Sequence, residues 1–506
     1  MRTKTITILF MSFTILFAQD SLELVLTLTG EEGYLFGISI ATLDINGDGY
    51  DDFIVGSRHL PPNDQPGKVH IFLQGEELDG SVDYIITSPD SSGWFGYRIA
   101  NAGDVNNDGY GDFLVSSPAA EKAYLYFGAP VFSDTSYIVL NAPEEAFGFP
   151  HTIAGLGDVN NDGFDDFIIG DWEFTGQAFI YFGNNLVDTN YDLLIEGYPG
   201  ECCGVDVAGA GDVNGDGYDD VLIGFPCNCL ESRNGVIARL YYGGEDMDSI
   251  PDKEFDPGSP FSAGVSEAGD TNNDGFADIL VGSVAIGTVH LYFGGEDMDT
   301  IPDWTQSGDM FGWALSPCGD LNTDGYDDFM VSMSGSDMGA WGIINVYEGG
   351  TIVDTVPDYQ AFGEEVPGIG LDLDILSGQE AQATYIVTSG YSIITDESRV
   401  YIYSLLSLTT TDSSPPEIPK RFELRQNYPN PFNPKTTIQF GLPKFSHVSL
   451  IVFDIMGRKV DELINTDLNA GVHTVVWDAQ NHPSGIYIVK MITQDFTKTQ
   501  KIILLK

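Results

Sequence analysis

Short apolar runs alternate with turn-forming residues along most of the chain, and no long stretch has helical period. Runs such as FIVGS, FLVSS, FIIGD and VLIGF lie between segments rich in Gly, Pro and Asp. Each is followed by an alternating segment such as VHIFLQG, AYLYFG or VHLYFGG. Apolar or alternating runs bounded by turn signals predict β-strands, so we expect an all-β fold.

Six acidic segments of the form D-x-N-x-D-G-[YF]-x-D organise this pattern into a repeat. They begin at Asp44, Asp104, Asp158, Asp212, Asp270 and Asp320, which are separated by 60, 54, 54, 58 and 50 residues. A Phe-Gly pair opens four of the units, and Cys203-Gly204 and Phe261-Ser262 take its place in the other two. A unit of about 55 residues holds four short strands with their turns, which is the size of one propeller blade.

A seventh, degenerate unit follows the six. It opens at Phe362-Gly363 and contains the strand-like runs TYIVTSG and RVYIYSL, but its loop segment LDLDILSGQE lacks the acidic pattern. No outer strand follows it, and the early segment Leu22–Thr29 has no other partner. We therefore predict a seven-bladed β-propeller over residues 19–406, in which this segment completes the last blade and closes the ring.

The first acidic loop has the composition of a calcium site. Asp44, Asn46 and Asp48 place side-chain oxygens at alternate positions of a tight turn. Tyr50 can add its backbone carbonyl and Asp52 a further carboxylate. A flexible set of oxygen ligands with several carboxylates suits Ca²⁺, whereas Mg²⁺ demands stricter octahedral geometry.

About six Ca²⁺ sites are expected on this basis. The ligands predicted at the same five positions of the other loops are Asp104, Asn106, Asp108, Tyr110 and Asp112; Asp158, Asn160, Asp162, Phe164 and Asp166; Asp212, Asn214, Asp216, Tyr218 and Asp220; Asp270, Asn272, Asp274, Phe276 and Asp278; and Asp320, Asn322, Asp324, Tyr326 and Asp328.

Three alternatives compete with this interpretation of the loops. An EF-hand needs Glu at position twelve, where all six loops carry Val or Ile inside an apolar run. A dockerin-like module would place its loops about half as far apart. An Asx-rich turn without metal remains open for a single loop, but six copies on a blade-like period favour metal sites. Position eight varies among Asp, Gly and Ala and is not predicted to be a ligand.

The Phe-Gly pair followed by D-x-N-x-D-G-x-x-D resembles the FG-GAP repeats of the integrin α-subunit propeller family over about residues 22–405. The resemblance implies structural calcium loops that lie away from the ligand-binding face. The chain departs from the repeat pattern of this family at Cys203, at Phe261-Ser262 and in the seventh loop. We expect these departures to change the structure only within their own repeats.

Residues 407–420 are rich in Ser, Thr and Pro and predict an extended linker. Residues 421–506 contain short alternating strands typical of a small immunoglobulin-like β-sandwich. The run NYPNPFNP, Gly457-Arg458, Trp477-Asp478 and the segment Ser484–Tyr487 resemble the C-terminal sorting domain of type IX secretion clients. This implies that the type IX machinery is a partner; a generic adhesive domain is the alternative.

Residues 1–18 predict a signal peptide, with Arg2 and Lys4 before an apolar run that ends at Ala18. An uncleaved anchor is the alternative, and no other membrane-spanning segment is expected in the mature chain. Together with the tail, this predicts a protein that is secreted or held on the outer surface of a Gram-negative bacterium.

Charge is distributed unevenly. The formal net charge is −55, and residues 19–419 carry 8 Lys or Arg against 69 Asp or Glu. Such a surface repels nucleic acid, and bound cations are its natural compensation. Because export permits disulfides, we expect at least one among Cys202, Cys203, Cys227 and Cys229, with Cys318 as a buried free thiol.

These features predict an adhesion or binding module for an extracellular glycan or protein, and not an enzyme. Tryptophans in the predicted loops could stack on sugars, although such residues more often belong to blade cores; they are Trp94, Trp172, Trp304, Trp313 and Trp341. A polysaccharide-degrading lyase or hydrolase is one alternative, with Arg58-His59 and Arg98 as the least implausible cluster. A structural component of an extracellular layer is the other.

Overall fold

The computed structural model describes residues 20–31, 33–59, 65–75, 78–90, 94–144, 146, 148–171, 176–197, 206–225, 238–256, 263–283, 286–308, 310–333, 342–362, 369–377, 384–392, 397–404, 421–424, 435–444, 446–456, 458–468, 471–479, 482–493 and 496–504. The described strands fall into two compact units, one within Gln19–Ser407 and one within Leu408–Lys506. The predicted signal peptide, linker and cysteine cluster lie outside the described residues.

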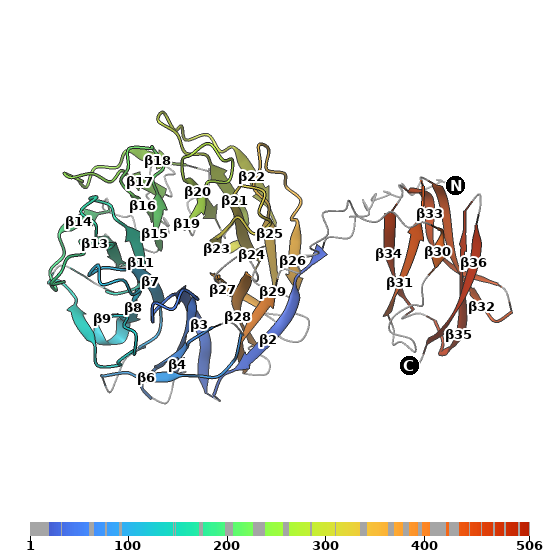
Figure 1. Cartoon of the computed structure of the whole chain (residues 1–506), viewed down its shortest axis with the longest axis horizontal. Helices are drawn as coiled ribbons and strands as arrows, with labels where there is room; N and C mark the ends of the chain where they lie inside the picture. Colours follow the sequence, from blue (N-terminus) through green and yellow to red (C-terminus); the bar gives the residue numbers. More distant parts are fainter. Residues whose placement is uncertain are drawn as a thin grey trace, which may run out of the picture. The chain divides into compact units, whose positions relative to one another are not determined.

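Each repeat of the first unit folds into one four-stranded antiparallel sheet, whose strands follow one another in chain order. Figure 1 shows these sheets arranged in a ring, as in a β-propeller. The first blade contains β3 (Tyr34–Leu43), β4 (Asp52–His59), β5 (Lys68–Phe72) and β6 (Tyr84–Thr87). The all-β prediction is confirmed, because the helical structure found within the described ranges is one 3₁₀ turn, Pro118–Ala120.

Blades two to six repeat this order. Their strands are β7 (Ile99–Gly103), β8 (Asp112–Ser117), β9 (Lys122–Tyr126) and β10 (Tyr137–Asn141); β11 (Thr152–Gly157), β12 (Asp166–Gly170), β13 (Gln177–Tyr181) and β14 (Leu193–Glu196); β15 (Asp206–Gly211), β16 (Asp220–Gly224), β17 (Ala238–Tyr241) and β18 (Lys253–Phe255); β19 (Ala263–Gly269), β20 (Asp278–Ser283), β21 (Thr288–Tyr292) and β22 (Trp304–Ser307); and β23 (Phe311–Gly319), β24 (Asp328–Met333), β25 (Ile343–Tyr347) and β26 (Tyr359–Phe362).

The last sheet closes the ring with strands from both ends of the unit. It joins β27 (Ile369–Leu376), β28 (Tyr385–Ser392) and β29 (Glu397–Ser404) to β2 (Glu23–Thr29), which runs antiparallel to β29. Figure 1 shows blue β2 beside orange β29. The predicted pairing of this early segment is confirmed. The sequence did not suggest β1 (Asp20–Ser21), which pairs in parallel with β26 of the preceding blade.

In each of the six blades that carry an acidic loop, the second strand is buried on both faces. This burial explains its continuous apolar sequence. Its first aromatic residue stacks on the residue that ends the third strand in several blades. The ring centroids lie 4.4 Å apart for Phe53 and Phe72, and 4.9 Å apart for Phe167 and Tyr181. These pairs form the centre of the cores between neighbouring blades.

The second unit consists of two sheets. One contains β30 (Glu423–Leu424), β31 (Lys435–Leu442) and β34 (Gly471–Asp478), and the other contains β33 (Lys459–Leu468), β32 (Ser446–Asp454), β35 (Gly485–Ile492) and β36 (Thr497–Leu504). Both sheets contribute to one core, in which Phe440, Trp477 and Val489 are buried. The immunoglobulin-like connectivity remains a prediction. Across the ranges that the structure describes, no helix has the length and apolar character needed to cross a bilayer.

Position eight of the acidic loops joins neighbouring blades, a role that the sequence analysis missed. Asp165, Asp219 and Asp327 each accept the backbone N–H of the first residue of the preceding loop, at 2.6, 2.9 and 2.8 Å. Gly111 and Ala277 have no side-chain acceptor, and their own N–H groups donate to the carbonyl of that first residue. The variable position therefore adds a second hydrogen bond between blades wherever it is Asp.

The seam between the last blade and the first uses the position-eight aspartate and two further carboxylates. Asp51, at position eight of the first loop, accepts the N–H of Ser377 at 3.0 Å. Asp372 Oδ2 accepts the N–H of Ile40 at 2.7 Å, and Asp374 Oδ2 accepts the N–H of Thr42 at 2.9 Å. The segment without the acidic pattern thus adds two bonds to the seam that closes the ring.

We expect Asp374→Ala to destabilise this seam, because it leaves the buried N–H of Thr42 without its partner. The cost of such a loss is about 1–3 kcal/mol. Chemical denaturation of the propeller transition, in calcium, measures it. The matched control is Asp246→Ala, which removes the same charge from an exposed loop residue. Equal midpoints for the two variants would contradict a role for Asp374 in ring closure.

Candidate metal centres

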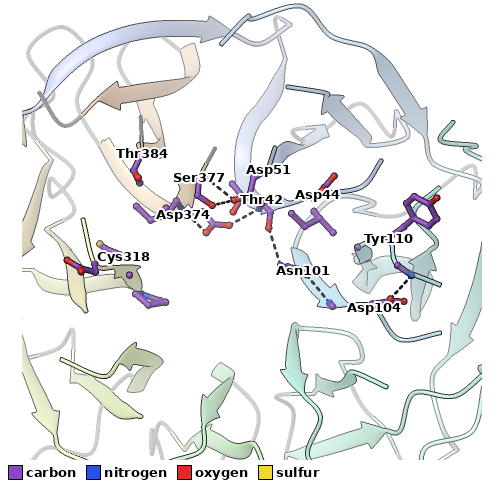
Figure 2. Close-up of a pocket in the computed structure, with 18 residues that line it drawn as sticks. Thr42, Asp44, Asp51, Asn101, Asp104, Tyr110, Cys318, Asp374, Ser377 and Thr384 are labelled. Carbon is purple, nitrogen blue, oxygen red and sulfur yellow. Dashed lines mark hydrogen bonds between the residues drawn. The ribbon is translucent and has the colours of Figure 1, made fainter. Parts of the chain in front are cut away.

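The six acidic loops all connect the innermost strand of a blade to its second strand. They therefore lie on one face of the propeller, at the end of the central channel. Figure 2 shows Asp44 and Asp104 of two neighbouring loops at a cavity of about 750 Å³, which Asp320 and the seam residue Asp374 also line. Cys318 borders the same cavity as a buried free thiol, as predicted.

Each loop is held as a tight turn by its own side chains. In the first loop, Asp44 Oδ1 accepts the N–H of Gly47 and Oδ2 accepts that of Gly49, both at 2.7 Å. Gly49 has φ 87°, as the turn prediction required. Position four also has positive φ in every loop, including 58° at Thr323, where a β-branched residue is disfavoured. The turn is thus preorganised by two left-handed residues.

The asparagine at position three offers an oxygen toward the loop interior. In four loops its Oδ1 accepts the N–H of position five, as for Asn46 and Asp48 at 2.8 Å. In the second and fifth loops, Asn106 Oδ1 and Asn272 Oδ1 are buried and have no hydrogen-bond partner among the described residues. A buried acceptor without a donor is costly, and a bound cation would satisfy it.

The aspartate at position nine is fully buried in all six loops. In the second loop, Asp112 Oδ2 accepts the N–H of Val105 at 3.2 Å and Oδ1 accepts that of Gly128 at 2.8 Å. The same two bonds recur in every loop, to position two and to the residues that follow the third strand. Each carboxylate oxygen has a further lone pair, so this residue can brace the blade and still bind a cation.

Burial and neighbouring carboxylates both raise the pKa of the position-nine aspartates. Burial is the largest of the effects that raise the pKa of Asp52 to about 7, and the charges of Asp48 and Asp44 contribute to it. Burial raises the pKa of Asp112 and Asp166 to about 8, again with contributions from the aspartates of their own loops. A cation among these groups would offset both effects.

No three His, Cys, Asp or Glu side chains form a metal cluster within the described ranges. The donor set predicted for each loop is mixed, with carboxylates, one asparagine oxygen and one backbone carbonyl. Hard oxygen donors of this kind fit Ca²⁺. The structure brings the predicted side chains of each loop into one turn, and the ligand assignment itself remains a prediction.

The tryptophans divide between surface and core. Trp94 and Trp313 are 41% and 44% exposed. Trp304 is buried against Phe329 and Tyr347 and donates its Nε1–H to a backbone carbonyl, so the blade-core alternative is confirmed for this residue. Trp172 and Trp341 lie outside the described residues.

Comparison with known families gives three matches. Residues 36–72 and 95–126 match the FG-GAP repeat, and residues 212–281 match the FG-GAP-like repeat. Residues 426–505 match the secretion system C-terminal sorting domain.

Curated relatives of the first unit are integrin α-chains. The chain is 32% identical to integrin alpha-PS2 of Drosophila melanogaster over 190 residues, which is 33% of this chain and 13% of that protein. It is 29% identical to integrin alpha-5 of Xenopus laevis over 235 residues, which is 42% of this chain and 21% of that protein. The matches thus span about a fifth or less of these relatives.

Among solved structures, a chain of the crystal structure of BBS1N in complex with ARL6DN, soaked with lead, aligns with TM-score 0.50 and 11% identity. The alignment covers 78% of this chain and 100% of that one, and at this identity it supports the fold alone. The chain thus contains segments that match FG-GAP repeats, is similar to integrin α-chains over part of its propeller, and ends in a segment that matches a secretion-system C-terminal sorting domain.

Proposed function

We propose that this protein is an exported, calcium-loaded propeller that binds a glycan or a protein outside the cell and is not an enzyme. The observation that carries the proposal is the set of six loops with one shared geometry, which stiffen a closed ring and leave its opposite face available for ligands. Propellers commonly use such a rigid ring of loops for binding.

The two ends of the chain are proposed to direct the export of the propeller. In the proposal, residues 1–18 are the signal peptide, 19–406 the propeller, 407–420 the linker and 421–506 the sorting domain that engages the type IX machinery. The match to a sorting domain indicates a secreted or cell-surface protein. We assign that surface to a Gram-negative bacterium.

Calcium is proposed at each of the six loops, and it would add stability because it binds only the folded turn. At a concentration 100-fold above its Kd, a ligand adds about 2.7 kcal/mol per site. We expect the thermal midpoint of the full chain to rise by many degrees in calcium over excess chelator, with magnesium substituting poorly. An unchanged midpoint would rule out structural calcium.

A single loop can be tested by Asp216→Asn, which removes one proposed ligand charge and keeps the shape of the side chain. We expect calcium titration by calorimetry to show one site lost or weakened roughly tenfold or more, since charge-assisted contacts carry this much. Asp246→Asn makes the same charge change at an exposed residue outside the loops and serves as the control. The proposal for this loop fails if the two variants bind calcium identically.

The binding function is tested by screening the calcium-loaded chain against arrays of extracellular glycans and surface proteins. Saturable, calcium-dependent binding supports it. A chain that forms large regular assemblies without binding any ligand would instead be a structural component of an extracellular layer.

One observation favours an enzyme as the second candidate. The guanidinium carbons of Arg58 and Arg98 lie 5.6 and 5.5 Å from the ring centroid of Tyr97, whose hydroxyl is 3.4 Å from His151 Nε2. Burial, with the charge of Arg98, lowers the pKa of His151 to about 4, so the ring is neutral near pH 7. A cationic group beside a neutral base is what a lyase on acidic sugars needs. Ultraviolet absorbance from unsaturated uronate products would reveal such cleavage.

A further inference from the structure

One arginine on the face opposite the acidic loops has no anionic partner among the residues that the structure describes. Arg58 lies near the end of β4, whereas the metal loop precedes the start of that strand. Trp94 and Tyr97 precede β7 at the same face. The guanidinium carbon of Arg58 lies 4.6 Å from the Trp94 ring centroid and 5.6 Å from that of Tyr97. Stacked aromatic faces hold the guanidinium in a fixed plane.

The body has 69 acidic and 8 basic side chains, so carboxylates greatly outnumber cations. Among the described residues, Lys68 pairs with Glu31, Lys122 with Asp90 and Arg239 with Glu254, whereas Arg98 and Lys253 make no ion pair. Among the described residues Arg58 makes no ion pair, and its Nε is buried with no hydrogen-bond partner. Burial lowers the pKa of Arg58, and no carboxylate opposes that shift.

A different arginine interacts with the buried carboxylates. Arg98, whose guanidinium carbon lies 5.5 Å from the Tyr97 ring centroid, is the cation whose charge lowers the pKa of the buried Asp206 and Asp372 against the raising effect of burial. Those carboxylates are therefore matched by a different arginine. The N–H donors of Arg58 are therefore available to a group that does not belong to the described residues.

The geometry points to Arg58 and Trp94 as a binding site for a sugar that carries a carboxylate, such as a uronic acid residue in an otherwise neutral glycan. This inference rests on the proposed binding function. The terminal N–H groups of Arg58 would donate to the carboxylate, as a planar guanidinium does best. The 41% exposed Trp94 offers apolar ring surface to the sugar.

A sugar fits this site better than a strongly acidic peptide or a nucleic acid. The excess of negative charge on the body repels ligands with dense negative charge. A glycan with a single carboxylate and otherwise neutral sugars is repelled much less. An exposed aromatic ring also makes a favourable contact with the flat, largely apolar face of a sugar.

The test uses the full chain saturated with calcium. Its probes are oligosaccharides with one glucuronic, galacturonic or mannuronic acid residue, and the same oligosaccharides after reduction of the carboxyl group. Calorimetry should show at least roughly tenfold weaker binding of the reduced forms. Arg58→Gln should remove this difference, and Trp94→Ala should weaken both forms alike.

Lys253→Gln, which removes one positive charge on β18, is the matched control and should bind as the parent does. Thermal midpoints in calcium report whether each variant folds. If Arg58→Gln does not fold, Arg58→Lys keeps the charge and loses the planar fork, and it should bind the uronate several-fold more weakly.

Equal affinity for the uronate and reduced forms, or a preference that survives Arg58→Gln, would overturn the inference. So would equal competition by a short peptide with a single glutamate. Binding of neutral glycans or proteins without dependence on a carboxylate would overturn this site and leave the proposed binding function intact. If no ligand of any kind binds in the wider screen, the proposed function fails as well.

Discussion

The propeller depends on a fully buried carboxylate at the ninth position of each acidic loop. In the third blade, Asp166 accepts the N–H of Val159 at 3.0 Å and that of Gly183 at 2.7 Å. These bonds tie the start of the loop to the end of the third strand, so one side chain fixes the relative positions of three strands. Burying a carboxyl group is costly, and the two backbone N–H groups that its oxygens accept reduce this cost.

The same residue links the fold to the proposed metal chemistry. Burial raises the pKa of Asp166 to about 8, with contributions from Asp162 and Asp158. A divalent cation held by the loop would stabilise the ionised form. The loops also bond to their neighbours, since the carbonyl of Asp158 accepts the N–H of Asp219 at 3.4 Å. Ordering one loop therefore supports the next blade, and six such loops stiffen one whole face.

The face opposite the acidic loops varies from blade to blade. Trp94 and Tyr97 precede the innermost strand of the second blade, His151 precedes that of the third, and Asp206 begins that of the fourth. A rigid scaffold with variable loops is the usual arrangement for recognition sites. Arg58, which makes no ion pair with the described residues, lies on this variable face.

The sequence by itself determined the all-β class, the repeat and the loop chemistry, because strand period, turn residues and ligand spacing are local properties. It also predicted that Glu23–Thr29 pairs with the last blade, since a leftover strand and a blade without an outer strand complete one another. Tertiary structure alone decided which charged groups meet. Position eight looked unimportant because its partner lies in another blade, about 60 residues away. Asp372 and Asp374 looked like a failed metal loop, yet they bond to β3 across more than 300 residues. Arg58 and Trp94 are 36 positions apart in the sequence, and only the packing of blade two against blade one brings them together.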